Sequence, residues 1–185
     1  MRLPLILLGV LTVSSCHVPR VIGPMHRQGP HKLDTVKMIE QVYYSVDHML
    51  AQHPKMQDTD RILVATADDV NNVQSTSELG RVLTECIQAR LTHNDHDVIH
   101  PTVREDHLLV QHDGQFLLSR DARNLAVDYN ARSALVTTYS VVANSVIVSM
   151  KLVSTIENST VAAQDFVLAR TESVTEMLSA KTGRR

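Results

Sequence analysis

The chain has 185 residues, of which 43% are hydrophobic and 21% charged, with a formal net charge of −2. The near balance of 18 Lys and Arg against 20 Asp and Glu, with four Tyr, two Phe and no Trp, argues against nucleic-acid binding by phosphate neutralisation or base stacking. Two cysteines exclude a disulfide-rich scaffold and a four-thiolate zinc site, and leave one disulfide bridge open. The length predicts one domain with a short extension.

The first fifteen residues have the pattern of a bacterial export signal. Arg2 supplies a positive charge, an apolar run of 11 residues extends from Leu3 to Val13, and two serines follow it. This order of a basic start, an apolar run and a small-residue exit is typical of a cleaved signal peptide. The run is too short to cross a bilayer as a helix. We therefore predict that residues 1–15 form a signal peptide that is removed.

Cys16 stands directly after this segment. The stretch from Leu11 to Cys16 resembles the lipobox of bacterial lipoproteins, in which the chain is cut before the cysteine and the thiol is acylated. The resemblance implies diacylglycerol and palmitate on this residue, and several acyl chains hold a protein at a membrane almost permanently. An Asp after the cysteine resembles an inner-membrane retention signal, whereas His17 stands here and points to the outer membrane. The alternative is an ordinary secretory signal in which Cys16 is incidental.

The mature chain then divides into a tether, a domain and a tail. Five Pro and Gly residues within residues 16–32 predict an irregular tether. Residues 33–181 form the predicted domain, and residues 182–185 form a basic tail. If Cys16 carries lipid, Cys86 has no disulfide partner within the chain, and we predict that it is a small buried hydrophobic residue and not a reactive thiol.

Hydrophobic periodicity divides the first part of the domain into helices and short strands. Apolar residues recur every three or four positions in two segments, which predicts amphipathic helices, the second capped by one of the residues at 75–77. A short apolar run between them is typical of a strand buried on both faces. The predicted elements are helices at 33–52 and 79–91, a strand at 62–67, a polar loop at 68–75, an edge strand at 97–103, a short helix within 104–112, and a helix from Ser119 or Asp121 to Tyr129.

The last third of the domain changes to an alternating pattern. It predicts strands at 134–142 and 145–153 joined by a tight turn, a third strand at 162–170 and a final short helix around Val174. The sequence therefore predicts a single-domain α/β fold, a two-layer sandwich whose mixed sheet ends in a C-terminal antiparallel three-strand meander packed against helices.

Three histidines are weak candidates for a metal site. His93, His96 and His100 lie around the predicted end of a helix and before a proline, so their spacing does not bring them together, and surface histidines are the favoured interpretation. The adjacent Asp68 and Asp69 are interpreted as solvated, because neighbouring residues do not face each other. The sequence contains no recognisable nucleophile, zinc-protease or phosphate-binding motif. It therefore predicts neither a catalytic residue nor a cofactor.

Several stretches together resemble one known family. They are residues 62–65 and 75–87, the helix entry at 117–126, and the paired segments 135–140 and 146–153. With the lipobox, they resemble the FlgO family of flagellar outer-membrane lipoproteins over about residues 60–170.

The resemblance implies an outer-membrane protein, anchored by lipid on Cys16, that acts as a structural or protein-interaction component of the cell envelope and supports flagellar assembly or motility. It implies other envelope or flagellar proteins as partners and no enzymatic activity. A related architecture occurs in curli-secretion lipoproteins and in lipoprotein activators of peptidoglycan synthases. The alternatives are therefore a regulator of peptidoglycan synthesis or a subunit of an envelope secretion assembly, and then a histidine-dependent periplasmic metal binder.

Overall fold

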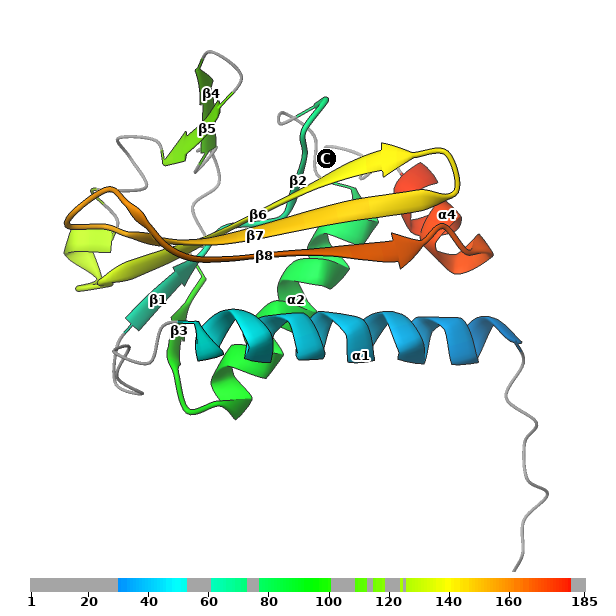
Figure 1. Cartoon of the computed structure of the whole chain (residues 1–185), viewed down its shortest axis with the longest axis horizontal. Coiled ribbons are helices and arrows are strands. Elements are labelled where there is room, and N and C mark those ends of the chain that lie inside the picture. The colour runs from blue at the N-terminus through cyan, green and yellow to red at the C-terminus, as the bar shows by residue number, and fades with distance from the viewer. Residues whose placement is uncertain are drawn as a thin grey trace, which may run out of the picture.

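A mixed sheet covered by helices dominates the structure (Figure 1). The computed structural model describes residues 30–52, 61–72, 77–100, 109–112, 115–118, 124 and 126–180. The labelled helices are α1 (Pro30–Ala51), α2 (Glu78–His93) and α4 (Glu172–Ser179). The labelled strands are β1 (Arg61–Val64), β2 (Asp68–Asp69), β3 (Asp97–Ile99), β4 (Leu109–His112), β5 (Gln115–Leu118), β6 (Ser133–Val142), β7 (Ser145–Ser154) and β8 (Thr160–Ala169).

The sheet combines parallel and antiparallel pairing. Its order is β3-β1-β6-β7-β8, and β2 pairs with β6 off this path. Strand β1 runs parallel to both β3 and β6, and α2 provides the crossover from β1 to β3 that parallel strands need. Strands β6, β7 and β8 are antiparallel neighbours. The predicted α/β fold with a mixed sheet and a C-terminal meander is therefore confirmed, and β4 and β5 form a separate hairpin.

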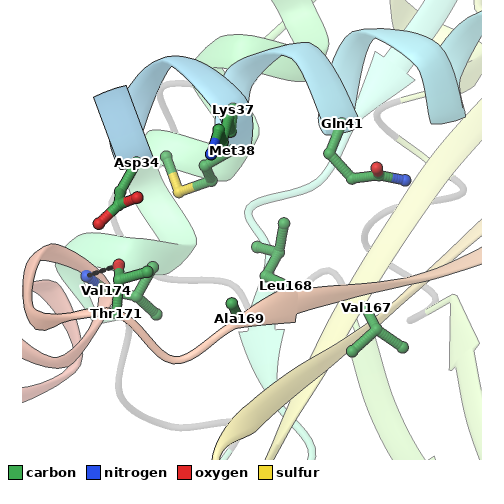
Figure 2. Close-up of a pocket in the computed structure, with 9 residues that line it drawn as sticks. All are labelled: Asp34, Lys37, Met38, Gln41, Val167, Leu168, Ala169, Thr171 and Val174. Carbon is green, nitrogen blue, oxygen red and sulfur yellow. Dashed lines mark hydrogen bonds between the residues drawn. The ribbon is translucent and has the colours of Figure 1, made fainter. Parts of the chain in front are cut away.

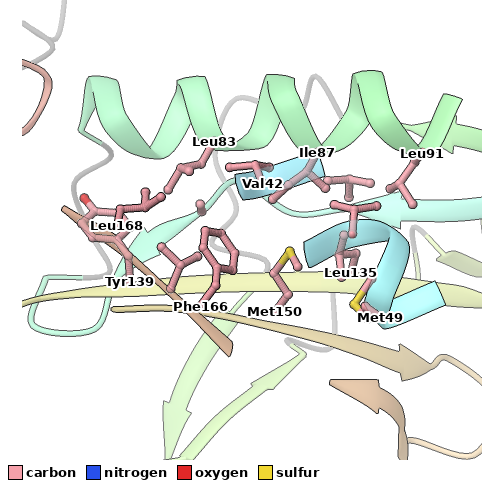
Figure 3. Packing of buried hydrophobic residues seen from close by; sticks show 14 of the residues in the cluster. Val42, Met49, Leu83, Ile87, Leu91, Leu135, Tyr139, Met150, Phe166 and Leu168 are labelled. Atoms are coloured by element: carbon pink, nitrogen blue, oxygen red, sulfur yellow. The ribbon is translucent and has the colours of Figure 1, made fainter. Parts of the chain in front are cut away.

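The main core lies between one face of the sheet and the helices. Figure 3 shows side chains of α2 pointing toward those of β6, β7 and β8, with α1 beside them. The residues of this cluster are almost entirely aliphatic, in keeping with the composition. The fully buried members include Val42, Met49, Leu83, Ile87, Leu91, Leu135, Met150 and Leu152.

The opposite face of the sheet is only partly covered. A small cluster of Leu63, Ala126, Ala131, Ala134 and Val136 closes it near β1 and the start of β6. Farther along the meander, the side chains of Val142, Ile147 and Val167 are exposed on this face. Ile147 pairs with Val167 across β7 and β8, so two of these apolar side chains are neighbours.

Helix α1 begins earlier than the sequence predicted. It starts at Pro30, so residues 30–32 belong to the helix and not to the tether. Proline suits the first turn of a helix, because the N–H group that it lacks has no partner there in any residue. The composition of the segment indicated a helix breaker, whereas the position of the proline makes it a helix start.

Helix α2 is fastened to the sheet at its first turn. The Ser77 hydroxyl accepts a hydrogen bond from Gly80 N at 3.0 Å, which identifies Ser77 as the N-cap among the three predicted candidates. The Tyr139 hydroxyl donates to the same oxygen at 2.7 Å. Burial raises the pKa of Tyr139, so this phenol stays a donor. The cap therefore links α2 directly to β6.

Two sequence predictions are wrong. Asp68 and Asp69 form β2 by pairing in parallel with Thr138 and Tyr139, and Asp68 is buried and not solvated. Residues 109–112, included in a predicted short helix, form β4, which pairs with the unpredicted β5. Segments of two to four residues are too short for periodicity to separate helix from strand, and long-range pairing decides them.

The remaining elements follow their predictions closely. The β6–β7 hairpin has its turn at Ala143 and Asn144, as expected, with Ala143 at a φ of 41°. Residues 124 and 126–128 are helical, within the helix predicted to end at Tyr129. The rest of that helix at 119–123, the predicted helix residues at 104–108 and the strand extension at 101–103 lie outside the described residues.

Candidate functional site

A groove separates the first half of α1 from the second half of β8. Its volume is about 280 Å³, and its residues come from α1, β8 and the start of α4. Figure 2 shows Leu168 pointing toward α1 and Val167 pointing away from it. The lining residues of this α1–β8 groove are Asp34, Lys37, Met38, Gln41, Val167, Leu168, Ala169, Thr171 and Val174. Its floor is apolar and its α1 side is polar.

The second half of α1 is tied to β8 by polar contacts. His48 Nδ1 lies 2.7 Å from Gln164 Oε1 and donates to it, because a carbonyl oxygen only accepts. Gln52 Nε2 also donates to Gln164 Oε1, at 3.4 Å, and Gln52 Oε1 accepts from Ala163 N at 3.5 Å. The groove therefore ends where these side chains bridge helix and strand.

The second half of α1 is also clamped to α2. Asp47 accepts two hydrogen bonds from the Arg90 guanidinium, at 2.7 and 2.6 Å, and a third from Asn94 Nδ2 at 2.9 Å. The guanidinium also lies 5.5 Å from the centre of the Tyr43 ring. The hydrogen bond from Arg90 holds the pKa of Asp47 below its usual value. Charge pairing and ring contact therefore hold the two helices together at this end.

A second, smaller hollow lies beside the first half of α2. It has a volume of about 240 Å³ and is lined by Thr66, Arg81, Thr84, Glu85 and His100. The Thr84 hydroxyl is already used, since it accepts from Ala67 N at 2.9 Å and donates to Gly80 O at 2.7 Å. Gln88 Nε2 donates to His100 Nδ1 at 2.7 Å. These contacts stabilise the junction of strand and helix and supply no nucleophile paired with a base.

The three candidate histidines have different surroundings. His93 at the end of α2 and His100 beside Gln88 are exposed, as the favoured interpretation expected. That interpretation is wrong for His96, which is buried with its Nδ1 unpaired among the described residues. The left-handed backbone of Asp95, at a φ of 63°, turns the chain between His93 and His96. Within the part of the chain that the structure describes, no three His, Cys, Asp or Glu residues are grouped to hold a metal ion.

The two cysteines have separate outcomes. Cys86 is a half-buried free thiol on α2 that packs against the main core, as the sequence predicted. Burial raises its pKa, which disfavours the reactive thiolate. Cys16, the predicted lipidation site, lies outside the described residues.

The α1–β8 groove has no counterpart among the sequence predictions. The apolar lining residues fit regular apolar stripes, as Met38, Leu168 and Val174 show. Such a stripe does not indicate that the first half of α1 is separated from β8. The available signal was Val167, an apolar residue on the outward side of an alternating strand. Among the described helices, none is both long enough and apolar enough to cross a membrane.

Comparison with known proteins decides the family. The chain matches the family described as FlgO protein over residues 43–173, which extends from α1 to the first turn of α4. The chain belongs to the FlgO family. This confirms the resemblance found in the sequence. No curated protein matches the chain in sequence.

Solved structures share the fold of this FlgO-family chain. The LpoB C-terminal domain from Escherichia coli is 18% identical, with a TM-score of 0.52, and the match covers 71% of this chain and 97% of that one. The LpoB C-terminal domain from Salmonella enterica is 16% identical, with a TM-score of 0.52, and the match covers 70% of this chain and 96% of that one. At these identities the likeness shows the fold alone.

Proposed function

We propose that this FlgO-family chain is an outer-membrane lipoprotein that acts through protein contacts in the cell envelope and supports flagellar assembly or motility. The family match over residues 43–173 carries the proposal. The export pattern of residues 1–15 and the lipobox ending at Cys16 support the membrane anchor. In this proposal, Cys16 holds the membrane and the α/β domain contacts the partner.

The chemistry of the domain favours binding over catalysis. The α1–β8 groove has an apolar floor of Met38, Leu168 and Val174, with Asp34 and Lys37 at its side. An apolar surface with a few charged groups is suited to recognition of another protein. The raised pKa of Cys86 makes that thiol a poor nucleophile. We therefore propose a non-enzymatic component of the envelope.

The anchor limits how far the domain reaches. Thirteen residues, 17–29, separate Cys16 from the start of α1. A fully extended chain spans at most ~3.5 Å per residue, so this segment reaches roughly 45 Å. The start of α1 therefore lies within about this distance of the membrane surface.

The anchor is tested by comparing the two cysteines. Cells expressing Cys16→Ser or Cys86→Ser are grown with radiolabelled palmitate and then fractionated. We expect Cys16→Ser to lose the label and leave the membrane fraction, and Cys86→Ser to keep both, because only the first thiol belongs to the stretch that resembles a lipobox. Retention of label by Cys16→Ser would contradict the proposed lipidation, and loss of label from both variants would point to a general defect in export.

A specific observation favours one second candidate. The fold is shared with the LpoB C-terminal domain, which supports the alternative that this chain is a regulator of peptidoglycan synthesis. Deletion of the gene separates the two candidates. We expect slower swimming in soft agar with normal resistance to cell-wall antibiotics. Normal swimming with increased sensitivity to those antibiotics would support the second candidate instead.

A further inference from the structure

Within the part of the chain that the structure describes, strand β8 is the last strand of the sheet, and its outer edge faces no other strand. Val142 and Ser145 flank a two-residue turn, and residues in that position exchange main-chain hydrogen bonds with each other. Hydrogen-bonded pairs alternate along a strand. The odd-numbered residues of β7 therefore form main-chain hydrogen bonds with β6, and the even-numbered ones form them with β8. The odd-numbered residues of β8 therefore direct their main-chain groups outward. The bond from Ala163 N to Gln52 agrees with this assignment.

Side chains bind two main-chain groups of this edge. Gln52 accepts from Ala163 N, and Gln164 Nε2 donates to Asp165 O at 2.8 Å. At the far end, Ala169 O accepts from Thr171 N at 2.9 Å. The outward main-chain groups between these two points differ, because most of them lack a hydrogen-bond partner. Within the described part of the chain, the N–H of Asp165, the N–H and C=O of Val167 and the N–H of Ala169 have no hydrogen-bond partner.

Apolar surface lies on both sides of this free edge, which we define as residues 165–169. On the helix side is the α1–β8 groove with Met38 and Leu168 (Figure 2). On the open side, the side chain of Val167 is 59% exposed next to Ile147. A strand added to this edge would point its side chains alternately to these two surfaces. Both sets of side chains would then be partly buried.

A carboxylate defines the charge of the site. Asp165 lies two residues before Val167, on the same open face and next to Ser149 of β7. The structure gives its carboxylate no ion pair among the described residues. A Lys or Arg directly opposite on an added strand would lie close to this carboxylate. The edge therefore favours a strand with a basic residue two positions from an apolar one.

We propose that the free edge of β8 binds an extended segment of a partner protein as an additional strand. The segment places an apolar side chain beside Val167, a Lys or Arg beside Asp165, and an intervening apolar side chain in the α1–β8 groove. Main-chain hydrogen bonds provide affinity and the two surfaces provide specificity, as in other cases of strand addition. This inference adds a contact surface to the proposed function and does not depend on acylation of Cys16.

A second copy of the chain is a poorer occupant. Pairing of two β8 edges would place residues of the same strand opposite each other. Strand β8 contains no Lys or Arg between Thr160 and Ala169, so no basic residue would face Asp165. The charge of the edge therefore favours a different chain.

Peptide binding tests the proposal with purified protein. The probe is a fluorescein-labelled peptide, acetyl-Ser-Thr-Thr-Val-Val-Lys-Ser-amide, and a matched peptide carries Glu in place of Lys. Fluorescence anisotropy should show saturable binding of the Lys peptide, with about fivefold weaker binding of the Glu peptide. Hydrogen exchange should slow at the amides of residues 165, 167 and 169 when the Lys peptide is added.

Two variants and a control locate the binding surface. Val167→Pro removes an outward N–H and no bond to β7, and Val167→Lys places a charge on the edge while keeping that N–H. Each should weaken binding of the Lys peptide at least about tenfold. Val142→Lys is the control, because Val142 is exposed to 48% on the same face but lies on β6. We expect it to bind the peptide as the unmodified protein does.

Other results would overturn the proposal. They are the absence of saturable binding, equal binding of the Lys and Glu peptides, and equal binding by the Val167 variants. A dimer in light scattering that Val167→Lys dissociates would assign the edge to a second copy. Slow exchange of the Val167 amide in a peptide-free monomer would assign it to another segment of the same chain. None of these results bears on acylation of Cys16, so failure here is distinct from failure of the proposed anchor.

Discussion

The two halves of α1 differ in how they meet the rest of the protein. The second half is fixed by Asp47 to α2 and by His48 and Gln52 to β8. The first half stands apart from β8 and leaves the α1–β8 groove beside an unsatisfied strand edge. One amphipathic helix therefore supplies both a structural support and one wall of the proposed binding surface.

This difference shows how an exposed strand edge is managed. Unpaired edges promote association with other chains, and proteins commonly cover or charge them. Here Gln52 and Gln164 bind the Ala163 N–H and the Asp165 C=O, whereas the N–H and C=O of Val167 stay free beside an apolar groove. A partly covered edge directs strand addition to the part that is left free.

Substitutions of buried residues in the two halves of α1 should have the largest effects on the free energy of unfolding, and these effects should differ between the halves. Met49 is fully buried in the second half of α1, and Met38, at 5% exposure, lines the groove in the first half. We expect Met49→Ala to lower the free energy of unfolding by about 2–5 kcal/mol and Met38→Ala by about 2 kcal/mol or less, because the second truncation opens onto an existing hollow. Urea unfolding measures both, and equal losses would contradict the comparison.

Loss of the ion pair between Asp47, in the second half of α1, and Arg90 should have a smaller effect on stability, and this effect should depend on pH. The pKa of Asp47 in the folded protein lies below its ordinary value of 3.8, chiefly because of the hydrogen bond from Arg90. Its stabilising contribution is therefore full above that ordinary value and is lost as the pH falls through the lowered folded pKa. We expect Asp47→Asn to reduce stability at pH 7 by less than Met49→Ala does, and to flatten the decline in acid.

Thermal unfolding at a series of pH values checks this expectation. The matched control is Asp34→Asn, an acidic residue of the same helix that lies in the first half and lines the groove. The control should lower the unfolding temperature at pH 7 by less than Asp47→Asn does, because the hydrogen bonds from Arg90 and Asn94 go to Asp47. An unchanged acid limb in Asp47→Asn would show that the clamp adds nothing to stability.

Removal of one edge cap should have the smallest effect on global stability and a clear local one. Gln52→Ala removes the acceptor for Ala163 N, on the surface of the protein. We expect a change in unfolding free energy within about 0.5 kcal/mol. Hydrogen exchange should become faster at the Ala163 amide and stay the same at the Val167 amide, since only the first binds Gln52, which directly follows α1. Equal changes at both amides would mean that the two halves of the edge are coupled.

Prediction from sequence succeeded where periodicity was long and failed where contacts were distant. Strands β7 and β8 alternate between buried and more exposed residues over most of their length, and the α2 stripe from Leu79 to Leu91 follows the helical period. By contrast, β2 consists of two aspartates whose strand conformation depends on pairing with β6. Pro30 was interpreted from composition as part of the tether, although its position makes it the first residue of α1.

The candidate surface shows the same limit. The sequence predicts lipidation of Cys16 from a pattern of consecutive residues, and this prediction requires no knowledge of tertiary contacts. It did not mark the free edge of β8, because the main-chain groups of Val167 become unsatisfied only when β8 is the last strand and α1 diverges from it. Sheet order and helix angle are properties of the packed chain.

The sequence by itself determined the α/β class, the meander, the family and the aliphatic nature of the core, since these follow from residue type and from spacing along the chain. Only the tertiary structure decided which half of β8 is covered, where α1 leaves a groove and how Asp47 meets Arg90. These features join residues 43 or more positions apart, or depend on how an entire helix is placed on the sheet. Local periodicity carries no information about contacts at that separation.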